Sequence, residues 1–136
     1  MEALFAILSL GLAACLPVPT SAQNPIVAVN KGAASGVMQR INFHNTVHAD
    51  CTSAGYPTVR IVTPPANGRL VIEPVMDYPQ FPATNQRYPC NLKSVPGTAV
   101  SYLSNPGYVG PDTATVEALF PSAGTLWQRQ YNISVR

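Results

Sequence analysis

The two histidines are the residues whose types and spacing point most directly to chemistry. His44 and His48 are the only histidines of the chain, and they stand four residues apart. An even spacing puts both side chains on one face of a strand, and a spacing of four also aligns them on a helix. Neutral imidazoles bind copper or zinc, and Asp50 or Met38 could complete such a site. The spacing therefore allows a periplasmic copper- or zinc-binding function, whereas ordinary polar residues in a turn before Cys51 are the alternative interpretation.

Catalytic groups are harder to find in this sequence. Nucleophilic catalysis needs a serine or cysteine beside a base that a third group orients, and the pattern Gly-x-Ser-x-Gly does not occur. Hydrolysis by paired carboxylates needs two positioned acids, but we expect Glu73 and Glu117 to face water on their strands. A glycine-rich phosphate loop is also absent from the sequence. We therefore expect a protein that is not an enzyme and carries no cofactor, with a small secreted enzyme as an alternative.

An aromatic, proline-rich stretch is the main candidate for recognition. Residues 73–97 contain five prolines, more than a strand usually tolerates, so we expect a long loop with one short strand near 86–91. Tyr78, Phe81, Arg87 and Tyr88 belong to residue types that dominate binding hot spots, and Met76 stands beside them. One hypothesis is that loop 76–96 binds a protein or cell-envelope partner. The other is that its rings cap one end of the domain as a small satellite core.

The N-terminal segment indicates export. Residues 3–16 are apolar except for Ser9, and this run is shorter than the roughly 20 apolar residues that span a bilayer. Two prolines follow, and then Thr20-Ser21-Ala22 places small residues where signal peptidase requires them. We therefore expect a signal peptide over residues 1–22 and a mature domain over residues 23–136, periplasmic or secreted, with no transmembrane segment.

Two other interpretations of this segment stay open. Leu12-Ala13-Ala14-Cys15 is similar to a bacterial lipoprotein cleavage box, in which Cys15 would carry the lipid and become the first residue. A buried N-terminal helix of a cytoplasmic protein is the third possibility. Removal of the signal peptide leaves Cys51 and Cys90, and two cysteines in a short secreted domain predict one disulfide. A zinc site would instead need four ligands at close spacing, which this sequence lacks.

Charge excludes one large class of partner. The chain has 8 Lys and Arg against 6 Asp and Glu, and loss of Glu2 with the signal peptide raises the formal net charge from +2 to +3. The basic residues are scattered and form no run. Because nucleic-acid binding needs a clustered basic patch, we expect no nucleic-acid partner.

The elements that must position these residues are strands. Alternation of apolar and polar residues predicts strands over 26–29, 37–43, 58–63, 70–73, 98–103, 114–120 and 127–135. In the second of these, Val37, Gln39, Ile41 and Phe43 would share a face. The turn Pro64-Pro65-Ala66-Asn67-Gly68 is expected to join the third and fourth strands as a hairpin. About seven short strands in one small domain predict an all-β, two-sheet antiparallel sandwich.

Turn motifs in the second half of the chain resemble a known family. The segment Pro65-x-Asn67-Gly68-x-Leu70-x-Ile72 resembles the P-x-N-G-x-V hairpin of bacterial cadherin-like and Ig-like repeats. The segments Val100-Ser101-Tyr102 and 105–112 resemble their Y-x-P-x-x-G-Y-x-G-x-D stretch. The match covers residues 64–136, as a single copy and without the usual aromatics after the final aspartate. The resemblance implies an Ig-like sandwich, non-enzymatic, in the bacterial envelope or outside the cell.

The same stretch has a physical interpretation of its own. Gly107 and Gly110 bracket Tyr108, so a tight corner can return the tyrosine to the sheet. Asp112 can accept backbone N–H bonds that close the turn. A calcium-ligand role for Asp112 is the alternative, although calcium takes 6–8 oxygens and no second acid is close in sequence.

Overall fold

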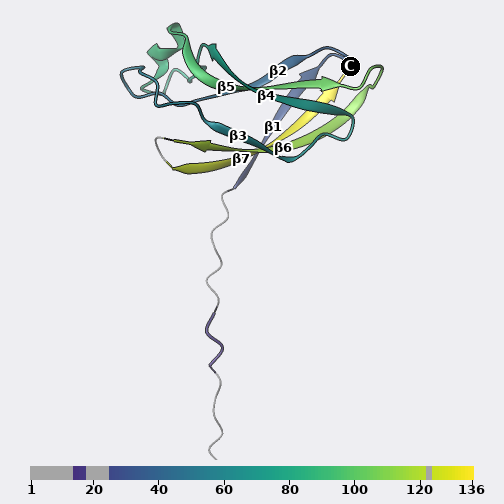
Figure 1. Cartoon of the computed structure of the whole chain (residues 1–136), viewed down its shortest axis with the longest axis horizontal. Coiled ribbons are helices and arrows are strands. Elements are labelled where there is room, and N and C mark those ends of the chain that lie inside the picture. Colours follow the sequence, from purple (N-terminus) through teal and green to yellow (C-terminus); the bar gives the residue numbers. More distant parts are fainter. Residues whose placement is uncertain (1–13, 18–24, 122–123) are drawn as a thin grey trace, which may run out of the picture.

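Two β-sheets pack face to face in the computed structural model, which describes residues 14–17, 25–121 and 124–136. The described residues form seven strands and one short 3₁₀ helix. They are β1 (Ile26–Ala33), β2 (Gln39–Asn45), β3 (Thr58–Thr63), β4 (Gly68–Asp77), η1 (Tyr88–Leu92), β5 (Val95–Ser104), β6 (Gly110–Phe120) and β7 (Thr125–Val135). One sheet has the order β1-β7-β6-β3 and the other β2-β5-β4. Figure 1 shows the two layers, with the end of β6 and the start of β7 at one end and the C-terminus at the other.

The strand order is that of an Ig-like sandwich with one change. If the strands are lettered A to G in chain order, β2-β5-β4 matches the B-E-D set and β7-β6-β3 the G-F-C set. The first strand departs, because β1 lies beside β7 and runs parallel to it. No turn joins these two strands, so nothing in the connection forces an antiparallel direction. The expected all-β, two-sheet sandwich is confirmed, and its other described strand pairs are antiparallel.

The core lies between the inner faces of the two sheets. The C-terminal hairpin pairs β6 with β7 over their whole lengths, as the alternation predicts. Every second residue of each strand enters the core, because successive side chains of a strand point to opposite faces. The buried cluster consists of Ala33, Ile41, Leu70, Val100, Tyr102, Ala114, Val116, Tyr131, Ile133 and Val135.

The expected hairpin between residues 58–63 and 70–73 is wrong. β3 pairs with β6 in one sheet, and β4 pairs with β5 in the other. The turn between them therefore carries the chain across the sandwich. Pro64 and Pro65 have no N–H to donate to a ladder at this point. The next two N–H groups, of Ala66 and Asn67, bond to Asp112 on β6, both at 3.1 Å.

The strand expected over 37–43 begins later and changes its facing. β2 starts at Gln39, and Val37 precedes it as an exposed residue. An irregularity in its pairing with β5 falls between Arg40 and Asn42. Such a bulge shifts which side chains point inward. As a result Ile41 and His44 are the buried residues of this strand.

The proline-rich loop is shorter than the sequence suggests. β4 continues to Asp77, and β5 begins at Val95, so the irregular segment covers residues 78–94. The short strand expected near 86–91 is instead the 3₁₀ helix η1, which Pro89 permits at its first turn. Its local bonds run from Cys90 N to Arg87 O and from Lys93 N to Cys90 O.

Little of the N-terminal segment belongs to the described part of the chain. The expected cleavage point after Ala22 lies outside the described residues. Cys15 falls inside them and is exposed and free. Within the described ranges no helix has the length and apolar character needed to cross a membrane.

Candidate functional site

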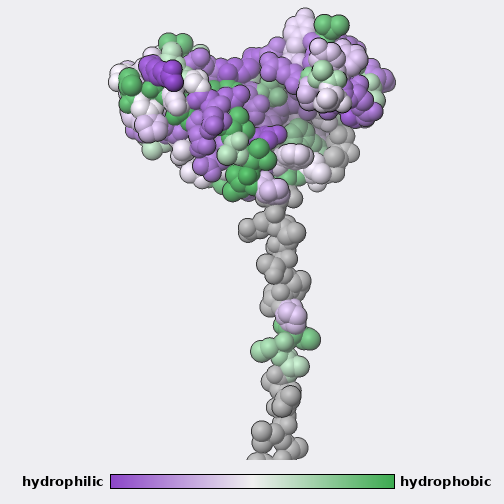
Figure 2. All heavy atoms as spheres, turned by 180° about the vertical axis from the view of Figure 1, so that it is seen from behind, coloured by the Kyte–Doolittle hydropathy of each residue, from purple (hydrophilic) through white to green (hydrophobic). Residues whose placement is uncertain are grey.

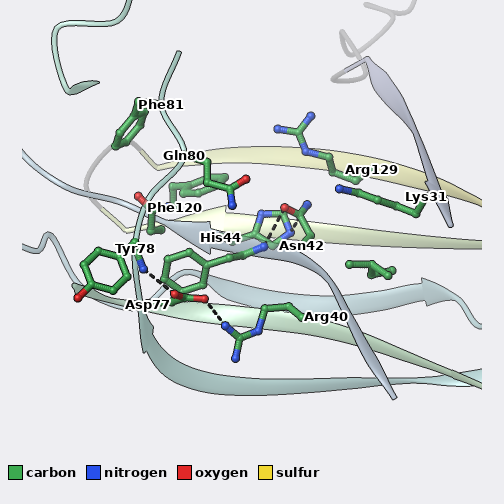
Figure 3. Close-up of a pocket in the computed structure, with 13 residues that line it drawn as sticks. Lys31, Arg40, Asn42, His44, Asp77, Tyr78, Gln80, Phe81, Phe120 and Arg129 are labelled. Carbon is green, nitrogen blue, oxygen red and sulfur yellow. Dashed lines mark hydrogen bonds and ion pairs between the residues drawn. The ribbon is translucent and has the colours of Figure 1, made fainter. Parts of the chain in front are cut away.

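A pocket opens between the two sheets along their edge strands β1 and β2, and it reaches the end of the sandwich where loop 78–94 begins. Its walls come from Lys31 of β1, from residues 40–45 of β2, from Phe120 at the end of β6, from Arg129 of β7, and from Asp77, Tyr78, Gln80 and Phe81. Its volume is about 530 Å³, within the range of roughly 300–1,000 Å³ that small-molecule sites occupy. Figure 3 shows His44 and Asn42 in the middle, aromatic rings to one side and cationic side chains to the other.

The charges of the pocket do not balance. Lys31, Arg40, Arg129 and Asp77 line it. Arg40 forms an ion pair with Asp77. Lys31 and Arg129 form no ion pair with any described residue. The Arg129 guanidinium instead lies over the ring of Trp127, 5.4 Å from its centroid. Two positive charges of the pocket are therefore left without a partner carboxylate in the described part of the chain.

His44 is the buried centre of the site. Its Nε2 lies 3.3 Å from both the Tyr131 hydroxyl and Asn42 Nδ2, and Asn42 Nδ2 also donates to the Tyr131 hydroxyl at 2.8 Å. Burial, and after it the positive charge of Arg129, lower the pKa of His44 to about 4. Burial also raises the pKa of Tyr131. The imidazole is thus neutral at pH 7, and the site gains no third positive charge from it.

Gly97 leaves the room that one aromatic side chain of the pocket wall needs. Gly97 lies opposite Asn45 in the pairing of β2 with β5. A Cβ at position 97 would come within 2.3 Å of the Phe43 ring, a distance at which atoms clash. The glycine therefore lets Phe43 pack closely against the backbone of β5. Phe43 in turn lines the pocket next to His44.

The loop beside the pocket is fixed at several points. A disulfide joins Cys51 to Cys90, and Cys90 is fully buried. Arg87 Nε donates to the carbonyl of Val47 at 2.8 Å. Asn91 bonds both backbone groups of Phe81, each at 2.8 Å. The disulfide and the Arg87 bond hold the second half of the loop to residues 47–51 after β2, and the Asn91 bonds hold the first half to the second. The disulfide is compatible with an oxidising, exported location.

The four residues expected to bind a partner separate into two groups. Tyr78 and Tyr88 are exposed, at 54% and 50%. Phe81 is half-buried and packs on a second small cluster formed by Val47, Cys90 and Val95, and Arg87 anchors the loop through its bond to Val47. Tyr78 and Phe81 also line the pocket. The Phe81 ring is therefore part of a small satellite cluster, whereas the Tyr78 and Tyr88 rings are exposed.

The candidate metal ligands lie in different surroundings. β2 ends at Asn45, so His48 belongs to the following turn, where it is exposed. The Asp50 carboxylate accepts bonds from the hydroxyl and the N–H of Thr52, which lower its pKa. Met38 is exposed ahead of β2. Among the described residues, no group of three or more His, Cys, Asp and Glu could hold a metal ion.

The turn residues lie at the opposite end of the sandwich. Gly107 and Gly110 have φ values of 78° and 137°, which residues other than glycine rarely adopt. The Tyr108 hydroxyl donates to the carbonyl of Pro111. The buried Asp112 accepts bonds from Ala66 and Asn67 and from the Tyr102 hydroxyl, the last at 2.7 Å. Burial and this carboxylate raise the pKa of Tyr102.

One expectation for the carboxylates is wrong. Glu117 is buried and forms an ion pair with Arg60 on the neighbouring strand, whereas Glu73 is exposed. β6 is an inner strand of its sheet, with β3 on one side and β7 on the other. Glu117 pairs with Arg60 on β3 and lies opposite Gln128 on β7, so neighbouring side chains flank it on both sides.

Sequence reasoning missed the cationic side of the pocket. Trp127, Tyr131, Ile133 and Val135 are the inward residues of the last strand, and Arg129 falls in the same alternating series. An arginine at an inward position was the signal that could have identified the site. Lys31 shares this property, because it stands in the inward series of β1 that ends at the buried Ala33.

Comparison with known proteins adds no family assignment. No protein-family model matches the chain, and no curated protein and no solved structure shows significant similarity to it.

Proposed function

We propose that the chain is a non-enzymatic, exported binding module of the bacterial envelope. It engages a protein partner with the end of the sandwich that carries loop 78–94. The observation that carries this proposal is a set of large apolar side chains exposed in loop 78–94 and at the end of β4 before it: Met76 at 58%, Tyr78 at 54%, Tyr88 at 50% and Leu92 at 89%.

Exposed apolar groups of this kind need a reason in a soluble domain, because clustered apolar surface marks interaction sites. Tyrosine is enriched at binding hot spots. The disulfide and the Arg87 and Asn91 bonds already order the backbone of the loop. Binding then loses less conformational entropy than it would with a flexible segment. Figure 2 shows green apolar spheres among purple polar ones on the raised lobe at the upper right, where the loop lies.

Two further features support the remaining parts of the proposal. The disulfide is compatible with export, and the lipoprotein alternative places an anchor at the exposed Cys15. The order of the B-E-D and G-F-C strands and the bonds of Asp112 to the 64–67 turn support kinship with Ig-like and cadherin-like repeats. For catalysis, the hydrogen bonds of the buried imidazole engage Asn42 and Tyr131 rather than a serine or cysteine in the described residues.

Site-specific photo-crosslinking in cells that export the full chain tests the proposal. A photoreactive amino acid at Leu92 is expected to give a discrete high-mass adduct, because this is the most exposed of the large apolar side chains of the loop. Val109, exposed at 65% in the turn at the opposite end, is the matched control. No adduct from Leu92, or the same adduct from both positions, would contradict the proposal.

A further inference from the structure

The unbalanced charge of the pocket between the sheets indicates what it accepts. Its wall holds three cationic side chains and one carboxylate, and the carboxylate of Asp77 already pairs with Arg40. The two remaining cations, Lys31 and Arg129, meet no carboxylate among the described residues. Arg129 also affects the interior of the site, since its positive charge, after burial, is the second cause that lowers the pKa of His44. A ligand that restores neutrality must carry negative charge.

The two sides of the pocket differ in their chemistry. In Figure 3 Arg129 and Lys31 lie on one side of His44, and Tyr78, Phe81 and Phe120 lie on the other. The Phe120 ring is 6.2 Å from the His44 ring. A smaller cavity adjoins the pocket and shares Phe120 and Arg129 with it, while adding Trp127. An occupant therefore meets cationic groups at one end and flat apolar rings at the other.

Polar groups between these ends remain available for hydrogen bonds. Asn45 lines the pocket, and its buried Oδ1 has no partner among the described residues. Buried polar atoms without partners are uncommon in native structures, so this oxygen is available to accept a hydrogen bond from a ligand. Gln80 extends its amide toward the same space in Figure 3. Together these amides can orient a ligand whose charge and ring are bound at the two ends.

We propose that this pocket binds a small organic anion, a carboxylate or phosphate group carried on a flat apolar ring. Arg129 and Lys31 bind the anionic group, because a guanidinium matches the geometry of carboxylate and phosphate oxygens. Phe120 and Phe81 contact the ring. The inference deepens the proposed function, on which it rests for its location at the loop end of the sandwich, and it adds the chemical class of a ligand.

The single tryptophan of the chain reports on this site. Trp127 stacks with Arg129, so an anion that engages the guanidinium is expected to change the tryptophan fluorescence. Phenyl phosphate is the probe, added to the protein as purified after export. Inorganic phosphate supplies the anionic group alone, and phenol supplies the ring alone. A saturable change is expected with phenyl phosphate, at a dissociation constant at least about tenfold lower than for either fragment.

Charge-neutral variants locate the binding. Arg129→Gln and Lys31→Gln are each expected to weaken phenyl phosphate binding at least about tenfold, measured by calorimetry because the first variant also alters the Trp127 signal. Arg69→Gln is the matched control, since Arg69 is an exposed arginine at the start of β4 that does not line the pocket. The control variant is expected to bind like the unchanged protein.

Three results would overturn the inference: no saturable binding at millimolar phenyl phosphate, equal affinity for inorganic phosphate, or an equal loss in Arg69→Gln. These failures are distinguishable from failure of the proposed function. The crosslink from Leu92 does not depend on the pocket, and phenyl phosphate binding does not depend on a partner protein. A crosslink without anion binding would overturn the ligand class alone.

Discussion

The two ends of the sandwich differ in whether their charged side chains have partners within the protein. At the end formed by the 64–67 and 105–110 turns, Asp112 is buried and its carboxylate accepts bonds from Ala66, Asn67 and Tyr102. At the other end a pocket begins that extends along the sandwich as far as Lys31, which pairs with Ile133, and its Arg129 and Lys31 have no carboxylate partner among the described residues. The first end is closed by contacts within the protein. The second is left incomplete.

This difference separates stability from binding within one small domain. A buried charge is tolerated when hydrogen bonds satisfy it, and it then fixes the structure around it. A charge that lines an open pocket keeps contact with water and contributes little to stability. The closed end therefore explains why the turns adopt one arrangement. The open end explains where a ligand can add contacts that the chain does not supply.

Removal of the disulfide is expected to have the largest effect, and it acts at the open end. The double variant Cys51→Ser with Cys90→Ser loses a link across a sequence separation of 39 residues. The free energy of unfolding should fall by about 4 kcal/mol, because the unfolded chain regains the entropy of that loop. Urea denaturation of both proteins measures the change. A loss of less than about 1 kcal/mol would show that contacts such as Arg87 to Val47 suffice to hold the loop.

Removal of the buried carboxylate is expected to have the next largest effect, at the closed end. Asp112→Ala leaves the N–H groups of Ala66 and Asn67 and the buried Tyr102 hydroxyl without their acceptor. A loss of about 3 kcal/mol is expected from denaturation, since hydrogen bonds to charged groups are the strong ones. Asp50→Ala, which changes an exposed carboxylate, should cost less. Equal losses in the two variants would remove the distinction between the ends.

Acid is expected to act through His44, with the smallest of the three effects. The pKa of His44 is lowered from 6.5 to about 4 in the folded protein, so the unfolded chain takes up the proton first as the pH falls. The stability contribution is full above pH 6.5 and is lost as the pH falls toward 4. When the pH falls from 7 to 5, protonation of His44 should lower the free energy of unfolding by about 2 kcal/mol.

Two histidine variants test whether His44 causes this pH dependence of stability. His44→Gln should flatten the loss of stability between pH 7 and pH 5, measured by denaturation at each pH. His48→Gln should leave the loss unchanged, because His48 is exposed in the turn after β2. An unchanged slope in His44→Gln would show that other groups cause the acid sensitivity.

The fold could largely be predicted from alternation, which depends on local geometry. The last two strands appear where their apolar residues predict them, because β6 and β7 have one inner and one outer face. Sheet membership could not be predicted in the same way. The Pro64–Gly68 segment has the composition of a hairpin turn, yet it joins two sheets because Asp112, 45 residues further from Asn67, takes its N–H groups. Such long-range contacts leave no local pattern.

The candidate site shows the same limit. The aromatic loop and its disulfide could be predicted, because tyrosines, prolines and paired cysteines are visible as types. The pocket could not, since it needs β1, β2 and β7 to come together from distant parts of the chain. The two histidines had a suggestive spacing, but β2 ends between them. A regular spacing aligns two side chains only if one strand or helix contains both residues.

Backbone amide NMR during a phenyl phosphate titration tests the central claim, that the open end is the binding end, most directly. We expect saturable shifts at Lys31, Asn45, Gln80 and Arg129, which line the pocket. Asn67 and Asp112, in the hydrogen-bonded network of the closed end, should stay unchanged. Shifts confined to the closed end, or no saturable shift at the pocket residues, would contradict the account.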